Sequence, residues 1–232
     1  MRNLVFTIFV FSFLKCYSQE NYIGFSLGMN KASVVRSNYS YYKSVQGMTI
    51  DGNYIFKKNH FFSKSNLGYN QKGSSQELIF VDSNAVFLGQ GAIEKTRFSY
   101  IGITELIGLE YGKEIFVNLG LGLSASYYMY TKVSTADFKL DNGGIVEGYN
   151  YKFRNLKPID LAVLSEICIG FKFKNQSALL LTSSYNLGIK KIKYKDGFTE
   201  NPWYNNFFSF KIGFRYLLKF NGSKFEVLTT CD

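Results

Sequence analysis

Residues 115–129 read IFVNLGLGLSASYYM, and this stretch decides the fold. Every second residue, beginning with Ile115, is apolar or aromatic, while glycine, serine and asparagine occupy most positions between them. Successive side chains of a β-strand point to opposite faces, so this strand would have one apolar face and one small, polar face. A soluble sheet of this length would bury its apolar face under a helix or a second sheet, and the chain has no helical pattern to provide that cover. The alternation therefore predicts a strand whose apolar face meets lipid.

The same alternation recurs along the chain in segments that are longer than the roughly 9–11 residues a tilted strand needs to cross a bilayer. Eight segments show it: residues 21–32, 45–56, 61–72, 96–111, 115–129, 156–173, 177–189 and 207–220. The third and fourth are the least regular, because Ser63 and Ser65 interrupt one apolar stripe and Glu105 interrupts the other.

Short and long connections between these segments alternate strictly. The short ones are residues 57–60, 112–114 and 174–176, and the long ones are residues 33–44, 73–95, 130–155 and 190–206. Outer-membrane barrels have short periplasmic turns and long extracellular loops, whereas a soluble lipocalin-like barrel has an apolar interior. We therefore predict an all-β fold, an eight-stranded antiparallel up-and-down transmembrane β-barrel, with loops 73–95 and 130–155 as its main working surface.

Composition agrees with a barrel and disfavours several other classes. The chain has 232 residues, 18% of them aromatic, and a mean hydropathy of −0.07. After the first twenty residues, no apolar run approaches the roughly 18 residues that a membrane-spanning helix needs. The net charge is +10, but the basic residues are scattered over strand ends and loops. This distribution favours contact with anionic lipid headgroups over nucleic-acid binding.

The first residues have the pattern of an export signal. Arg2 precedes a short apolar run that ends near Leu14, followed by Tyr-Ser-Gln at 17–19. We expect residues 1–19 to be a cleaved signal peptide, residues 20–220 to be the barrel and residues 221–232 to be a short tail. Lys15 directly before Cys16 disfavours lipidation, and Cys168 and Cys231 are expected to be free thiols.

Charged residues on the polar faces form the first candidate site. The set predicted for the barrel interior is Asp51, Asp160, Glu166, Lys211 and Arg215, with Lys172 near the end of its strand. An eight-stranded barrel is just wide enough for side chains to fill, and buried charges must be paired or hydrated. We expect an internal polar network that holds the barrel closed; a narrow ion or proton path is the alternative.

The sequence gives little support for a catalytic site or a metal site. His60 is the single histidine, so a hydrolase would need it as the base, yet it falls in a predicted turn with no serine elbow beside it. Asp137, Asp141 and Glu147 could bind calcium weakly but lack the spacing of an EF-hand loop. No enzymatic activity, metal or other cofactor is predicted.

Tyrosine-rich loops form the second candidate site. The residues proposed for interaction with a protein or glycan are Tyr39, Tyr41, Tyr42, Tyr149, Tyr151 and Trp203. Loops on a rigid scaffold are common binding surfaces, and tyrosine supplies both apolar and hydrogen-bonding contact.

The chain resembles the PorT-like outer-membrane β-barrel family of Bacteroidetes, which are eight-stranded barrels of the OmpA and OmpX kind. The segments that carry the resemblance are 22–30 (YIGFSLGMN), 67–73 (LGYNQKG), 119–124 (LGLGLS), 158–173 (PIDLAVLSEICIGFKF) and the aromatic strand 208–220. The resemblance implies a bacterial outer-membrane location and a final aromatic residue, here Phe220, that the barrel-assembly machinery reads. Some members assist a secretion system. From these features we predict a non-enzymatic barrel in contact with outer-membrane lipids and lipopolysaccharide; a PorT-like secretion accessory and a narrow porin-like channel are the alternatives.

Overall fold

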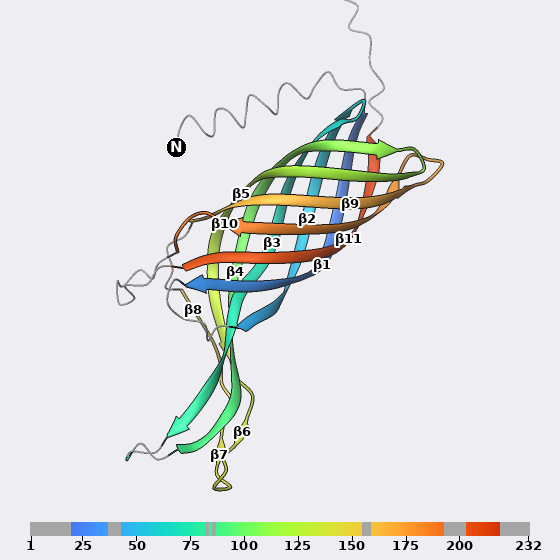
Figure 1. The fold of residues 1–232 in the computed structure, drawn as a ribbon. Coiled ribbons are helices and arrows are strands. Elements are labelled where there is room, and N and C mark those ends of the chain that lie inside the picture. Colours follow the sequence, from blue (N-terminus) through green and yellow to red (C-terminus); the bar gives the residue numbers. More distant parts are fainter. Residues whose placement is uncertain are drawn as a thin grey trace, which may run out of the picture.

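Long antiparallel strands make up nearly all of the computed structural model, which describes residues 20–36, 43–81, 84, 87–154, 159–192 and 203–218. The strands are β1 (Glu20–Arg36), β2 (Lys43–Lys58), β3 (Phe61–Val81), β4 (Phe87–Gly112), β5 (Ile115–Ser134), β6 (Phe138–Lys139), β7 (Ile145–Val146), β8 (Asn150–Phe153), β9 (Ile159–Lys172), β10 (Ala178–Gly188) and β11 (Trp203–Leu218) (Figure 1). Within these ranges, no helix is long and apolar enough to cross a membrane. The predicted signal peptide and tail lie outside the described residues.

Eight of these strands close into a barrel. They pair in the order β4-β3-β2-β1-β11-β10-β9-β5, and β4 also pairs with β5, which joins the two ends of the sheet. Every pairing is antiparallel, and only the β1–β11 pairing joins strands that are far apart in the chain. The predicted eight-stranded up-and-down barrel is confirmed. Closure leaves no strand edge within the barrel wall, which lipid could not satisfy by hydrogen bonding.

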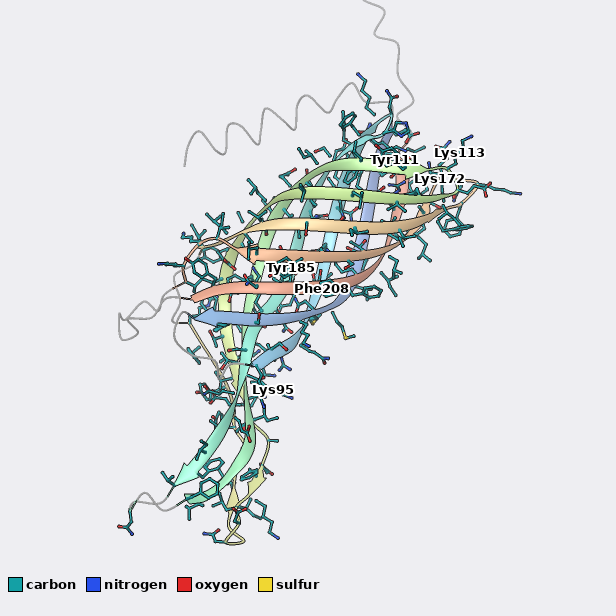
Figure 2. The ribbon with its side chains drawn as sticks, viewed as in Figure 1. Lys95, Tyr111, Lys113, Lys172, Tyr185 and Phe208 are labelled. Carbon is teal, nitrogen blue, oxygen red and sulfur yellow. The ribbon has the colours of Figure 1, made fainter. Side chains whose placement is uncertain are left out.

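The outer face of the barrel is apolar and the inner face is packed. On β4, for example, the outward Ile107 is 70% exposed and the inward Tyr100 only 1%. Aromatic residues lie towards both ends of the outer face: Tyr185 and Phe208 pair across β10 and β11 near one end, and Tyr111 lies near the other (Figure 2). An apolar belt between aromatic girdles is the outer surface of a transmembrane barrel.

The polar interruptions in the apolar stripes of β3 and β4 lie next to each other. Ser65 and Glu105 are register partners, and the Ser65 hydroxyl donates a hydrogen bond of 2.8 Å to Glu105 Oε2. Ser65 and Glu105, which the sequence shows as separate irregularities, therefore form one cross-strand pair on the outer face, and Ser63 lies opposite Ile107.

The turns at one end are tight, as predicted. Asn59 and His60 join β2 to β3, and Asn59 has a φ of 56°, a left-handed conformation that asparagine tolerates well. Gly112 has a φ of 109° at the start of the turn between β4 and β5. We refer to this end of the barrel as the turn end and to the opposite end as the loop end.

The sequence predicts long loops at residues 73–95 and 130–155, but much of both segments is strand. β3 continues to Val81 and β4 begins at Phe87, and the two remain paired beyond the barrel rim, with bulges at Leu78/Ile79 and Phe80/Val81. β5 continues to Ser134 and is joined there by β8. Serine and glycine near residue 73 resemble a turn in the sequence, but a ladder already formed in the barrel extends through such residues.

These strands build a projection, which we call the extension and define as residues 76–94 and 135–149. It contains the outer ends of β3 and β4 together with the small β6–β7 hairpin, and it leaves the barrel at the loop end (Figure 1). The part of the molecule beyond the loop-end rim is therefore built largely from strands. Other strands also run beyond their predicted bounds at this end: β1 continues to Arg36, and β11 begins at Trp203.

Candidate functional site

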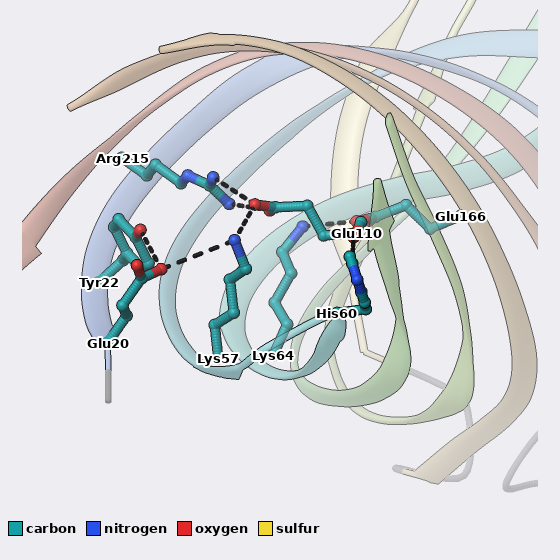
Figure 3. A network of polar contacts seen from close by, with 8 residues as sticks. All are labelled: Glu20, Tyr22, Lys57, His60, Lys64, Glu110, Glu166 and Arg215. Carbon is teal, nitrogen blue, oxygen red and sulfur yellow. Dashed lines mark hydrogen bonds and ion pairs between the residues drawn. The ribbon is translucent and has the colours of Figure 1, made fainter. Parts of the chain in front are cut away.

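The turn end of the barrel interior holds a connected set of charges (Figure 3). Arg215 on β11 binds Glu110 on β4 through two hydrogen bonds, of 2.7 Å from Nη1 and 3.2 Å from Nη2. Lys57 Nζ lies 2.5 Å from Glu110 Oε1 and 3.6 Å from Glu20 Oε2. The Tyr22 hydroxyl donates to Glu20 at 2.7 Å. Strands from both ends of the sequence are thereby tied together across the barrel.

Two further ion pairs cross the interior. Lys64 Nζ on β3 lies 2.7 Å from Glu166 Oε1 on β9, and Lys211 Nζ on β11 lies 2.7 Å from Asp51 Oδ2 on β2. All four side chains are almost completely buried. Each pair spans at least 100 residues of sequence. The first links β3 to β9 across the interior, and the second links β2 to β11, which flank β1 in the barrel wall.

A third arrangement closes the interior at the loop end. Lys72 Nζ lies 2.8 Å from Asp160 Oδ2, and the Asn205 amide donates to the same carboxylate oxygen at 3.2 Å. The lysine ammonium also lies 4.9 Å from the ring centroids of both Tyr100 and Phe207. A buried cation is thus compensated by one carboxylate and two aromatic faces.

Aromatic and aliphatic side chains fill the interior around these pairs. At the turn end, Tyr22, Ile55 and Phe62 form one buried cluster. At the loop end, buried residues cluster around Tyr100: Val34, Phe98, Tyr128 and Ile192. Between them, a polar void bordered by Asp51 and Lys211 has a volume of about 20 Å³, enough for roughly one water molecule. Side chains therefore fill almost the whole interior, and we call this filling the plug.

All five interior residues predicted from the sequence lie inside the barrel and are buried: Asp51, Asp160, Glu166, Lys211 and Arg215. Lys172, the sixth member of the set, is half-buried at the end of β9. Sequence reasoning missed four partners: Lys57, Lys64, Lys72 and Glu110. A signal was present for three of them. Lys64 and Lys72 lie an even number of residues from the inward Asn66, and Glu110 lies an even number of residues from the inward Thr104. The strand period of two therefore places all three side chains inside.

The residues considered for catalysis or metal binding have structural contacts. His60 is exposed in its turn, its ring is stacked on Tyr111 at a centroid distance of 5.3 Å, and its Nδ1 lies 3.2 Å from the backbone oxygen of Glu110. Asp137 Oδ1 accepts a hydrogen bond of 2.7 Å from the Gly148 amide. No group of three or more histidine, cysteine or acidic residues in the described ranges could hold a metal ion.

The cysteines fall into two groups. Cys168 is buried in β9 and forms no disulfide. Cys16 and Cys231 lie outside the described residues, so the prediction that Cys231 is a free thiol stays a prediction.

Aromatic residues hold the base of the extension together. The Tyr149 hydroxyl donates a short hydrogen bond to Glu94 Oε2. Burial and this bond to a carboxylate raise the pKa of Tyr149 to about 12. The Tyr149 ring lies 5.6 Å from that of Tyr151, which lies 5.6 Å from that of Phe153. Two of the predicted loop tyrosines therefore lie side by side.

The other predicted loop residues are not brought together. Tyr39, Tyr41 and Tyr42 lie outside the described residues. Trp203 begins β11, where its backbone pairs with that of Arg36.

The extension carries exposed apolar side chains beyond the barrel rim. Ile79 is 64% exposed and Ile145 71%, and Val81, Phe87 and Ile93 are also exposed. Within the described residues, β2 pairs with β3 no further than the Lys43–Ser75 contact, so the outer part of β3 pairs with β4 alone. Exposed apolar side chains gathered outside the membrane belt are typical of interaction surfaces. No sequence pattern pointed to them, because they were assigned to a loop.

No protein-family model matches the chain, and no curated protein sequence is similar to it. Several solved structures are similar. The attachment invasion locus protein Ail of Yersinia pestis, in complex with the heparin analogue sucrose octasulfate, is 14% identical with a TM-score of 0.42, over 85% of this chain and 100% of that one. Neisserial surface protein A is 12% identical with a TM-score of 0.44, over 84% and 96%. The outer membrane protein OprG of Pseudomonas aeruginosa is 11% identical with a TM-score of 0.43, over 89% and 99%. Values this low say nothing about function, and the barrel is established by its own strand pairing.

Proposed function

We propose that this chain is a non-enzymatic outer-membrane barrel protein that acts as a rigid anchor and presents its extension as an interaction surface. The observation that carries the proposal is the position of exposed Ile79, Ile93 and Ile145 on paired strands beyond the rim. Lipid cannot cover these side chains there. A protein or glycan ligand is the proposed partner, and lipopolysaccharide and the barrel-assembly machinery are the partners of the barrel itself.

The outer-membrane location is tested by cell fractionation combined with heat-modifiability on a gel. We expect a band in the outer-membrane fraction that shifts on boiling, because a closed barrel stays folded in detergent until it is heated. Protease added to intact cells should cut only at the loop end and in the extension. A soluble, unshifted protein would contradict the proposal.

The role of the extension is tested by shortening it at register pairs. Ser75 pairs with Lys95, and Ser134 pairs with Asn150. Replacing residues 76–94 and 135–149 each by an Asn-Gly turn therefore removes the extension and leaves every barrel strand intact. Cells displaying the shortened barrel should fold it normally but lose the adhesion to protein or glycan surfaces that the full chain confers. Equal adhesion by both forms would exclude the extension as the binding surface.

A role as a PorT-like secretion accessory is the second candidate, since the turn end also offers a surface. An open hollow of about 550 Å³ lies there, lined by residues 112–114 and 171–174, and Phe171 and Phe173 are exposed in it. Deletion of the tail 221–232 discriminates between the two roles. Lost secretion with an intact, heat-modifiable barrel would support the accessory role, and unchanged secretion would exclude the tail from it.

A further inference from the structure

Three cations face one another across three neighbouring strands at the base of the extension. Arg97 on β4 is the register partner of Lys132 on β5, and Lys132 is the register partner of Lys152 on β8. We call these three residues the cationic row. Like charges directly opposite one another destabilise a sheet, so the row costs the protein stability unless an anion lies against it.

In the described part of the chain, no carboxylate forms an ion pair with the row. None of the ion pairs found there includes a residue of the cationic row. Arg97 Nε donates to the backbone oxygen of Gln46 at 3.1 Å, and Lys152 Nζ lies 5.1 Å from the ring centroid of Tyr130. These contacts orient the two cations and leave their charges uncompensated.

The outer face beside the row is open and can hold a ligand. A hollow of about 510 Å³ is lined by Lys95, Arg97, Ser134, Thr135 and Asp137, among others. Lys95 is exposed at the base of the extension (Figure 2). It adds a cation to this side, so the hollow has two cations, Lys95 and Arg97, against the single carboxylate of Asp137, which accepts a hydrogen bond from the Gly148 amide. The hollow therefore favours an anion.

The row lies at the depth of lipid headgroups. Tyr127, 58% exposed, and Tyr130 precede Lys132 on β5, on the barrel side of the row. The Tyr130 hydroxyl lies 3.4 Å from that of Tyr69. Tyrosines at the edge of the apolar belt mark the membrane–water interface, so cations immediately beyond them meet headgroups rather than acyl chains or bulk solvent.

We propose that the cationic row binds the phosphate groups of an anionic glycolipid, of the lipid A class, in the outer leaflet. Arginine offers a fork of donors that matches phosphate geometry, and lysine adds point charges. The proposal rests on the outer-membrane location proposed above, because the loop end faces such a glycolipid only there.

The proposal predicts effects of opposite sign in two membranes. In nanodiscs of phosphatidylcholine alone, the triple variant Arg97→Gln, Lys132→Gln, Lys152→Gln should be at least as heat-stable as the wild type, because the repulsion is gone. In nanodiscs that also contain lipid A, the wild type should gain stability and the triple variant should not. Binding of fluorescent lipid A should weaken about 100-fold in the variant, since each cation near an anionic surface contributes a factor of roughly five.

The matched control removes three exposed lysines outside the row: Lys58→Gln, Lys139→Gln and Lys190→Gln. It has the same net charge as the triple variant and should keep the gain from lipid A. Unchanged lipid A binding by the triple variant would overturn the proposal. Equal stabilisation of the wild type by millimolar inorganic phosphate would overturn the lipid assignment and indicate a free-anion site. Both experiments use purified barrel, so their failure is separate from a failure of surface localisation in cells.

Discussion

Interior arginine and glycine residues illustrate how tightly single positions are determined. The Arg215 guanidinium carbon lies 4.1 Å from the ring centroid of Phe116 and 4.5 Å from that of Tyr22. The Phe116 ring in turn fits against Gly170, where a Cβ would come within 2.0 Å of Phe116 Cζ. The bidentate Arg215–Glu110 pair is thus held in place by rings that need a glycine opposite them.

The variant Gly170→Ala should be destabilised, since the added methyl group forces the buried Phe116 ring to move. Overpacking a filled interior costs about 1–3 kcal/mol. The midpoint of heat-induced unfolding on a gel should fall, and the second substitution Phe116→Leu should recover part of the loss. Gly52 provides a control, because the nearest atom to its Cβ would be 3.9 Å away. A normal midpoint for Gly170→Ala would contradict the packing described.

The variant Lys211→Met should also be destabilised, because it leaves the buried carboxylate of Asp51 without its ammonium partner at 2.7 Å. Removing one partner of a buried pair costs about 3–5 kcal/mol. The double variant Lys211→Met, Asp51→Leu should recover much of that free energy of unfolding, measured by denaturant titration in lipid. A matched substitution of the exposed Lys139 should have little effect, and an equal loss there would argue against the buried pair.

At the scale of elements, the extension depends on contacts between β4 and the segment that precedes β8. The bond from Tyr149 to Glu94 joins them, and Thr135 and Tyr149 are paired through their backbones at 3.0 Å. A Tyr149→Phe variant should keep the barrel intact and make residues 135–149 several-fold more sensitive to protease. Tyr151→Phe is the control, since no hydrogen bond of its hydroxyl contributes to the joint.

The same contact has a defined pH dependence. The pKa of Tyr149 is raised to about 12, whereas a tyrosine released from the fold titrates near about 10. The stabilisation is therefore complete below about pH 10 and is lost as the pH rises through about 12. The difference in tyrosinate absorbance between wild type and Tyr149→Phe should titrate near pH 12. A difference that titrates near pH 10 would show that the contact does not form.

At the scale of the whole molecule, the interior is closed at both ends by different chemistry. The turn end has the Arg215–Glu110–Lys57 set, and the loop end has the Lys72–Asp160 pair under Tyr100 and Phe207. We expect no conductance above leak in planar bilayers. Tyr100→Ala alone should remain silent, because the turn end stays closed. Discrete channels in the wild type would contradict this and favour the porin-like alternative.

Much of the barrel followed from local patterns. The alternation in residues 115–129 and its repetition required strands with one apolar face, and strict alternation of turn lengths required an up-and-down order. Asp51 and Arg215 alternate with the apolar residues of their strands, and this alternation likewise predicted that both lie inside. These features are determined by sequence because the side chains of a strand alternate between two faces, and only one of those faces contacts the membrane.

Only the tertiary structure decided which charges pair and where the barrel ends. Lys211 and Asp51 are 160 residues apart, and their contact depends on barrel closure and register, which no local pattern contains. The continuation of β3 to Val81 and of β5 to Ser134 was likewise invisible, because polar and small residues join a ladder when a neighbouring strand is already in place. The sequence by itself determined that the chain forms a barrel and which face meets lipid. Packing across the barrel and pairing beyond its rim determined the plug, the extension and the cationic row, because those contacts join residues that are distant in the chain.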